Sequence, residues 1–405
     1  MDFKLIGSVL LIVGTSIGAG MLALPIATAQ LGFAGSLILL LICWFVMTAG
    51  AFLLLEVNLW LPQNSNLISM AKATIGSGGQ LLSWLTYLLL LYSLLCAYIA
   101  GGSDLFHHLF VTRSIAIPAW VSTIIFTIVF SSVVYMGIHV VDYVNRGLMV
   151  IKFSAYILLI ILLVPVITSV NLQAGDFNNI TSATAITVTI TSFGYAAIVP
   201  SLRIYFAGDV HKLKKAIILG SLVPLLCYIA WDAVIMGVIP LQGTHGLGVL
   251  LHSDNSTSDL VNTLNTYTTK SSITFCVKLF TSICVLTSFL GVSLCLTDFL
   301  ADGLQLERKG KNNLFIHLMT FIPPLVIVLF YPKAFIQALE YAGIYCVILL
   351  ILIPAWMAWR GRYHKQLAKG FKVAGGKALL VFLMIFSIAM IIWGLIDKLA
   401  WLSKI

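Results

Sequence analysis

Charged residues are scarce in this chain. They make up 9% of its 405 residues, whereas a soluble protein has about 25%. Hydrophobic residues make up 60%, and the mean hydropathy is +1.06. No soluble core could bury so much apolar surface, so lipid must surround most of the chain. The net charge of +9 does not indicate nucleic-acid binding, because the basic residues stand in short segments between apolar runs.

Motifs for metal binding, disulfides and catalysis are also missing. The seven cysteines all fall in apolar runs without a CxxC pair, which argues against a zinc site or a disulfide framework. Neither the HExxH motif and clustered nucleophile of an enzyme nor the repeated filter loop of a channel is present. The first apolar run is too long for a removable signal peptide. We therefore expect neither an enzyme nor a cofactor or metal.

Apolar runs long enough to cross a membrane, about 20 residues each, recur along the whole chain. They predict 11 membrane-spanning helices, at 5–30, 33–56, 81–103, 116–138, 148–170, 182–206, 214–239, 272–300, 313–331, 334–357 and 378–399. The longest connection, 240–271, is too short for a further domain. The sequence predicts one all-α integral membrane domain over residues 1–405.

Lysine and arginine are distributed unevenly between the two sides of this arrangement. With the N-terminus in the cytoplasm, 17 of the 23 basic residues fall on the inner side. The outer side keeps Arg113, Lys270, Lys278, Lys333, Lys398 and Lys404. The positive-inside rule therefore places the N-terminus inside, and an odd number of spans places the C-terminus outside.

Two spans contain residues that interrupt helices. The first has three glycines between Gly14 and Gly20, followed by Pro25, at a cost to a regular helix of about 1 kcal/mol per glycine and about 3 kcal/mol for proline. The alternative is a GxxxG packing face made by Gly14 and Gly18. The sixth span repeats the pattern from Thr191 to Pro200, and it inserts with the opposite orientation. Paired breaks of this kind are typical of a transporter's binding site.

Unwound backbone at membrane depth determines what such a site can bind. It is tolerated only where it lines a cavity. Its free N–H groups and half-helix N-termini attract a carboxylate, and its free carbonyls attract an ammonium group or a metal ion. The two breaks together suit a zwitterion, and we therefore expect an amino acid as the substrate.

Five stretches carry a resemblance to a known family. They are G-T-S-I-G-A-G-M-L-A-L-P (14–25), L-L-L-E-V (53–57), V-D-Y-V-N-R (141–146), S-F-G-Y…V-P-S (192–201) and T-S-F-L-G-V (287–292). With these motifs the chain resembles the hydroxy and aromatic amino acid permeases of bacteria. The resemblance implies a leucine-transporter-like fold: inverted repeats of five spans each, at about 5–170 and 182–357, and an extra helix at about 378–399.

The resemblance also implies a function. It implies a monomer in the bacterial inner membrane, with its C-terminus in the periplasm, that imports an aromatic amino acid with protons. Tyrosine is the favoured substrate. Tyrosine-specific members carry Phe-His directly after the matching glycine, where this chain has Tyr195-Ala196. Tryptophan, another neutral amino acid and sodium coupling therefore remain alternatives.

The family's binding residues can be carried onto this chain position by position. The amides of Gly18, Ala19 and Gly20 would hold the substrate carboxylate. Carbonyls near Thr15, Ser16, Phe193 and Gly194 would hold its ammonium group. Tyr195 and Tyr92 would form the wall around the ring, and Ser192 and Ser288 complete the expected set.

Lys152 is the candidate for ion coupling. In related proton-coupled transporters a lysine on the fifth span takes the place of a bound sodium ion, and a buried lysine gives up its proton readily. The alternative is an anchor that snorkels to the cytoplasmic interface, because Lys152 is expected early in the span. Thr287, next to Ser288, would complete the ion site, unless these hydroxyls only bond to their own helix.

Several acidic residues lie in or near the spans. Glu56 is expected at the cytoplasmic interface. Asp298 and Asp302, one turn apart, are expected to be gate or loop partners of Arg146 or Arg203 at the inner side. Asp232 and Glu340 lie deeper, where an ionisable side chain is usually functional. The pattern assigns neither of them a role.

Overall fold

The computed structural model describes residues 3–111, 114, 116–268, 271–331, 334–368 and 370–402, and of Ser271 and residues 397–402 only the backbone. The described residues form helices and no strand. The helices are α1 (Phe3–Ser16), α2 (Ala19–Ala27), α3 (Gly32–Trp60), α4 (Leu67–Thr74), α5 (Ser77–Val111), α6 (Ala119–Tyr135), α7 (Ile138–Leu163), α8 (Ser169–Gln173), α9 (Ala183–Ser192), α10 (Val199–Tyr205), α11 (Val210–Val238), α12 (Leu247–Leu250), α13 (Ser256–Tyr267), α14 (Ser271–Gly303), α15 (Gly310–Phe330), α16 (Ala334–Val347), α17 (Ile353–Tyr363) and α18 (Gly376–Leu402). Of the basic residues used for the orientation, Arg113, Lys270, Lys333, Lys369 and Lys404 lie outside the described residues, and Lys398 is described by its backbone alone.

The helices have the length and composition of membrane spans. In the described part of the chain, nine helices are long and apolar enough to cross a membrane, and the bent pair α1–α2 would be a tenth. Helix α6 is apolar but has 17 residues, which corresponds to about 26 Å at 1.5 Å per residue. The chain is therefore an all-helical, multi-pass membrane protein.

The predicted start of the fifth span is wrong. Helix α7 begins at Ile138, ten residues before the expected start at 148. The error arose because Asp142 and Arg146 lower the local hydropathy, although a helix can continue beyond the apolar layer. The two side chains form an i,i+4 ion pair, with 2.8 Å between Arg146 Nη2 and Asp142 Oδ2, and such a pair stabilises a helix.

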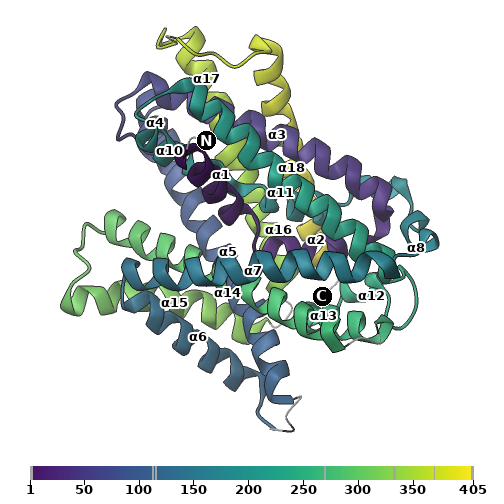
Figure 1. Cartoon of the computed structure of the whole chain (residues 1–405). Coiled ribbons are helices and arrows are strands. Elements are labelled where there is room, and N and C mark those ends of the chain that lie inside the picture. The colour runs from purple at the N-terminus through teal and green to yellow at the C-terminus, as the bar shows by residue number, and fades with distance from the viewer. Residues whose placement is uncertain are drawn as a thin grey trace.

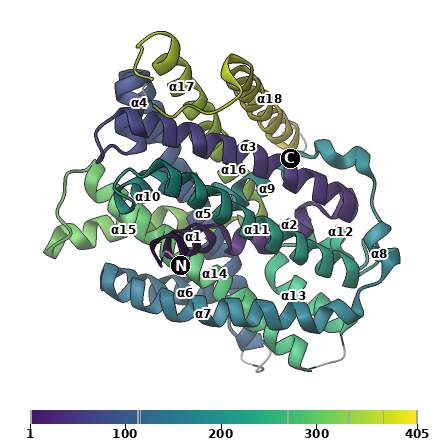
Figure 2. The same cartoon turned by 45° about the horizontal axis from the view of Figure 1, so that its top comes forward.

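The broken first span lies inside the helix bundle (Figure 1). Helix α1 packs on α11, α2 packs on α9, and α16 packs on both α5 and α9. Helix α7 packs along α14, and α18 lies against α17 near one edge of the molecule (Figure 2). Outward-facing side chains such as Ile128, Ile161 and Ile385 are more than half exposed, as expected of surfaces that contact lipid.

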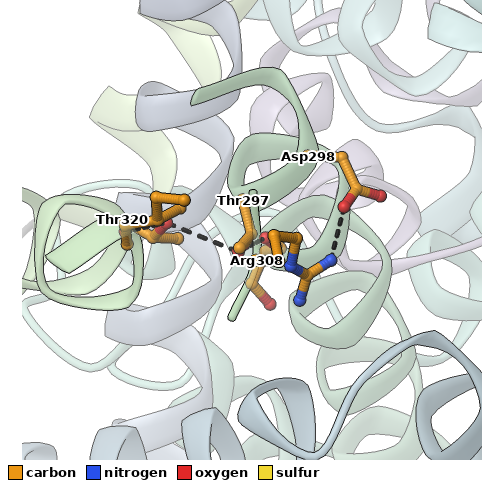
Figure 3. Close-up of polar contacts among 6 residues, drawn as sticks. Thr297, Asp298, Arg308 and Thr320 are labelled. Carbon is orange, nitrogen blue, oxygen red and sulfur yellow. Dashed lines mark hydrogen bonds and ion pairs between the residues drawn. The ribbon is translucent and has the colours of Figure 1, made fainter. Parts of the chain in front are cut away.

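The expected partners of Asp298 are wrong. Asp298 near the end of α14 pairs with Arg308, which lies in the connection to α15 (Figure 3). The adjacent Thr297 hydroxyl is hydrogen-bonded to the Thr320 hydroxyl of α15. Arg146 pairs with Asp142 instead, and Arg203 donates to the backbone carbonyls of Asn58 and Leu61. Arg308, ten residues after Asp298, reaches its carboxylate because of the path of the connecting loop. Sequence pattern alone does not determine the path of a loop.

Candidate functional site

The first span breaks where its glycines predicted. Helix α1 ends at Ser16, α2 begins at Ala19, and the two are bent by 54°. Gly18 between them has an extended backbone, with φ −153° and ψ −151°. Gly14 stays helical, and a Cβ there would lie 2.3 Å from the Cε atom of Met149 on α7. Gly14 therefore allows close packing, whereas the break lies at Ile17 and Gly18.

The interruption in the sixth span is milder. Helix α9 ends at Ser192, a 3₁₀ turn runs from Gly194 to Ile198, and α10 continues from Val199. The whole segment still qualifies as one span, Ala183–Tyr205. The interruption nevertheless falls at the predicted Ser192-Phe193-Gly194 sequence.

One tyrosine joins the two breaks. The Tyr228 hydroxyl of α11 lies 2.7 Å from the carbonyl oxygen of Ser16 and 2.7 Å from that of Ser192. A tyrosine has a single hydroxyl proton, so the two carbonyls share one donor. Sequence reasoning did not select Tyr228. The available signal was a polar group in an apolar span, since a buried tyrosine hydroxyl usually has a hydrogen-bond partner.

Lys152 is fully buried in the middle of α7. Its Nζ atom donates to the carbonyl of Ile17 in the first break at 2.7 Å and to the Thr287 hydroxyl of α14 at 3.3 Å. The alternative of an anchor at the interface is therefore wrong, because it depended on a helix start ten residues too late. The ammonium group links three helices at the break.

The hydroxyls of α14 complete this arrangement. Thr287 and Ser288 both donate to the carbonyl of Cys284 in their own helix. Thr287 also accepts from Lys152, and Ser288 accepts from the Ala19 amide at 2.9 Å. The amide expected to hold a carboxylate therefore already has a hydroxyl oxygen as its partner, which shows that it can bind an acceptor.

Two glycines bring the backbone of α2 close to its neighbours. A Cβ on Gly18 would lie 2.2 Å from the Ser288 Oγ atom, and one on Gly20 would lie 3.1 Å from the Ser192 Oγ atom. A contact of 2.2 Å is far below the van der Waals distance. Gly18 is therefore needed for close approach rather than for an unusual φ angle.

The aromatic residues at the second break are buried. Phe193 is buried and packs edge-on against the Tyr228 ring, with 5.1 Å between ring centroids. Tyr195 is buried, and its hydroxyl lies 3.0 Å from that of Thr48 on α3. Gly194 lies near Cys346 of α16.

One of the expected site residues makes its described contact elsewhere. The hydroxyl of Tyr92 donates to the carbonyl of Met319 on α15 at 2.7 Å. Thr15 precedes Ser16 at the end of α1, and its hydroxyl donates to carbonyls of the preceding turn. The structure thus brings together Ser16, Gly18, Ala19, Gly20, Lys152, Ser192, Phe193, Thr287 and Ser288.

Replacing Gly18 by alanine should abolish substrate binding, because the added Cβ would lie 2.2 Å from the Ser288 Oγ atom and would push the first break away from α14. The double variant Gly18→Ala, Ser288→Ala should recover part of the binding. With alanine at position 288, the nearest atom of that residue to the new Cβ is its own Cβ, 3.5 Å away. This is an ordinary van der Waals contact. Binding of radiolabelled amino acid to the purified protein measures both. Equal loss in the single and the double variant would contradict the steric explanation.

The sequence of this chain is similar to those of known transport proteins. Residues 1–394 match the tryptophan/tyrosine permease family. "Tyrosine-specific transport system 1" of Haemophilus influenzae is 34% identical over 95% of each chain. "Glutamine transporter 2" of Aliivibrio fischeri is 33% identical over 95% of this chain and 99% of its own. "Tryptophan-specific transport protein" of Pseudomonas aeruginosa is 28% identical over 99% of this chain and 96% of its own.

These matches extend over nearly the full length of this chain and of its relatives, and their family consists of transporters rather than enzymes. The two helix breaks, with the amide, carbonyl and ammonium groups between them, lie within the matched residues. The chain belongs to the tryptophan/tyrosine permease family.

Proposed function

We propose that this protein is a secondary transporter that imports an aromatic amino acid, with tyrosine as the substrate, by proton symport across the bacterial inner membrane. The N-terminus lies in the cytoplasm and the C-terminus in the periplasm. The observation that carries the proposal is the buried Lys152 ammonium group, bonded to the carbonyl of Ile17 at the break of the first span.

The proposed architecture has eleven spans in two inverted repeats and an extra helix, α18. In this assignment α3 and α5 correspond to α11 and α14, and α7 corresponds to α16–α17. The contact between α5 and α16 then has its counterpart in that between α14 and α7, and the contact between α1 and α11 has its counterpart in that between α9 and α3. Matched contacts of this kind support a pseudo-two-fold arrangement.

The substrate class follows from the groups at the two breaks. The Ala19 amide at the N-terminus of α2 suits a carboxylate, and the carbonyls of Ser16 and Ser192 suit an ammonium group. For a substrate to use those carbonyls, it must displace the Tyr228 hydroxyl from at least one of them. Phe193 and Tyr195 offer aromatic surface for a ring.

Lys152 is the proposed coupling residue. Protonated, it holds the first break to α7 and α14 through Ile17 and Thr287. When it loses its proton, both hydrogen bonds lose the positive charge of their donor and weaken. The bundle of α1–α2, α3, α9–α10 and α11 is then free to rock against the remaining helices. The membrane potential, about 2.3 kcal/mol per charge per 100 mV, assists the import of a zwitterion with a proton.

A second substrate class is supported by one relative. The glutamine transporter named above is 33% identical, and the match covers 99% of its length; the tyrosine-specific relative is 34% identical. Since the backbone groups at the breaks bind any α-amino acid, specificity depends on the side-chain pocket. Tryptophan and glutamine are therefore the rival substrates.

Reconstituted liposomes test the proposal. We expect radiolabelled tyrosine to accumulate under an inward proton gradient, with or without sodium. Unlabelled tryptophan, glutamine and serine serve as competitors. Uptake that follows sodium would contradict proton symport and point to Thr287 and Ser288. Uptake of glutamine or tryptophan without tyrosine would contradict the substrate and leave the transporter assignment intact.

A further inference from the structure

Asp232 is a buried carboxyl group that has no role in the transport cycle proposed above. It lies near the end of α11 and is fully buried. Its Oδ2 atom accepts a hydrogen bond from the Ser36 hydroxyl of α3. Its Oδ1 atom is also buried and has no hydrogen-bond partner among the described residues. Half of this carboxyl group is therefore unsatisfied.

The surroundings of Asp232 are apolar. Its neighbours Trp231 and Ile235 are buried, and the Trp231 ring packs on Phe280 of α14. The ion pairs found in the described part of the chain do not include Asp232. An ionised carboxylate without a cation or a full set of donors is strongly disfavoured in such a place, whereas the neutral acid is tolerated far better.

The helices around α11 offer Asp232 no compensating charge. Helices α2 and α8, which pack on α11, contain no ionisable residue. On α7 the Tyr156 hydroxyl donates to the carbonyl of Cys227 on α11, not to Asp232.

The remaining charged groups on those helices are engaged elsewhere. Lys4 of α1 lies over the Tyr205 ring, and Glu56 of α3 pairs with Arg362. On α7, Asp142 and Arg146 pair with each other, and Lys152 donates to Ile17 and Thr287. The contrast with Lys152 is informative, because its Nζ atom has two oxygen acceptors, as an ammonium group requires. The surroundings thus favour a charged Lys152 and a neutral Asp232.

Asp232 is also one turn from the candidate site. Tyr228, four residues earlier on α11, contacts both breaks, and residues four apart lie on the same face of a helix. Any movement of α11 that releases the carbonyls of Ser16 and Ser192 also moves the carboxyl group. Water that enters between α11 and α7 would stabilise the ionised form.

We propose that Asp232 is a second proton-binding site of this transporter, protonated in the conformation described here and deprotonated when α11 moves and water reaches it. The proposal deepens the proposed function and rests on it. Lys152 then controls the first break through its charge, while Asp232 takes up a proton when α11 covers it and releases the proton when water reaches it.

Infrared difference spectroscopy of the purified full-length protein tests the protonation directly. The carbonyl stretch of a protonated carboxyl group should be present at neutral pH in the wild type, and Asp232→Asn should remove it. Glu340→Gln is the matched control, because Glu340 of α16 is another buried carboxyl that accepts from a hydroxyl, that of Thr184. A spectrum unchanged by Asp232→Asn would overturn the proposal.

Transport in liposomes tests the role in the cycle. Asp232→Asn should reduce tyrosine accumulation under a proton gradient to the level of protein-free vesicles and leave tyrosine counterflow, which needs no gradient, at the wild-type level. Glu340→Gln should retain both activities. Wild-type accumulation by Asp232→Asn would overturn the proposal. Retained counterflow shows that the variant is folded.

Failure of the proposed function would look different. If the wild-type protein moves no tyrosine under any gradient, the proposed function fails, and the infrared measurement still decides whether Asp232 holds a proton. Because an amide replaces a neutral acid of the same shape, Asp232→Asn should also melt at the wild-type temperature. A large rise in melting temperature would indicate that an uncompensated, ionised Asp232 had been removed and would overturn the proposal.

Discussion

Replacing Glu56 by alanine should lower the free energy of unfolding by about 3–5 kcal/mol, because it leaves Arg362 as an unpaired buried charge. Glu56 is fully buried near the end of α3. Its Oε1 atom accepts from Arg362 Nε at 2.7 Å. Its Oε2 atom accepts from Arg362 Nη2 at 2.6 Å and from the Val373 amide at 2.7 Å. The pair joins α3, α17 and the segment that leads to α18.

Thermal unfolding of the purified protein measures this effect. The exposed pair of Glu307 and Lys309, with side chains 80% and 84% exposed, provides the control. Glu307→Ala should leave the melting temperature unchanged, since exposed pairs contribute about 0–1 kcal/mol. The double variant Glu56→Ala, Arg362→Ala should be less destabilised than the sum of the single variants, because no lone charge remains. Arg362→Ala melting at the wild-type temperature would contradict the argument.

Replacing Lys152 by alanine should abolish proton-driven accumulation of tyrosine. The variant loses both hydrogen bonds from the ammonium group, to Ile17 and Thr287. Each hydrogen bond to a charged group contributes about 1.5–3 kcal/mol, so one of them alone changes an equilibrium roughly 10- to 100-fold. The closed arrangement of the first break would then lose its link to α7 and α14.

Uptake and counterflow in the same liposomes measure this second effect. Lys311→Ala on α15 is the matched control, because Lys311 is an exposed lysine on another span. It should accumulate tyrosine as the wild type does. Counterflow by Lys152→Ala should persist, since exchange needs no net proton movement. Wild-type accumulation by Lys152→Ala would exclude Lys152 from coupling.

The helix breaks could be predicted from sequence because their cause is local. Glycine and proline disfavour the helix at the residues where they stand, so Gly18 and Gly194 marked the interruptions within one or two residues. Composition in the same way determined the all-helical membrane class, because lipid requires long apolar helices. The degree of each break was not predictable. The first bends by 54°, and the second remains a 3₁₀ turn within one span. The neighbouring helices determine how far the backbone departs from a regular helix at each break.

The sequence by itself determined the membrane class, the positions of the breaks and the candidacy of Lys152. Only the tertiary structure decided which groups meet there. Tyr228 reaches the carbonyl of Ser16 across 212 positions, and Arg362 reaches Glu56 across 306. Hydropathy and glycine penalties act over a few residues, whereas these contacts depend on which face each helix turns to its neighbours. Those faces are set by close packing throughout the bundle, which a local pattern does not contain.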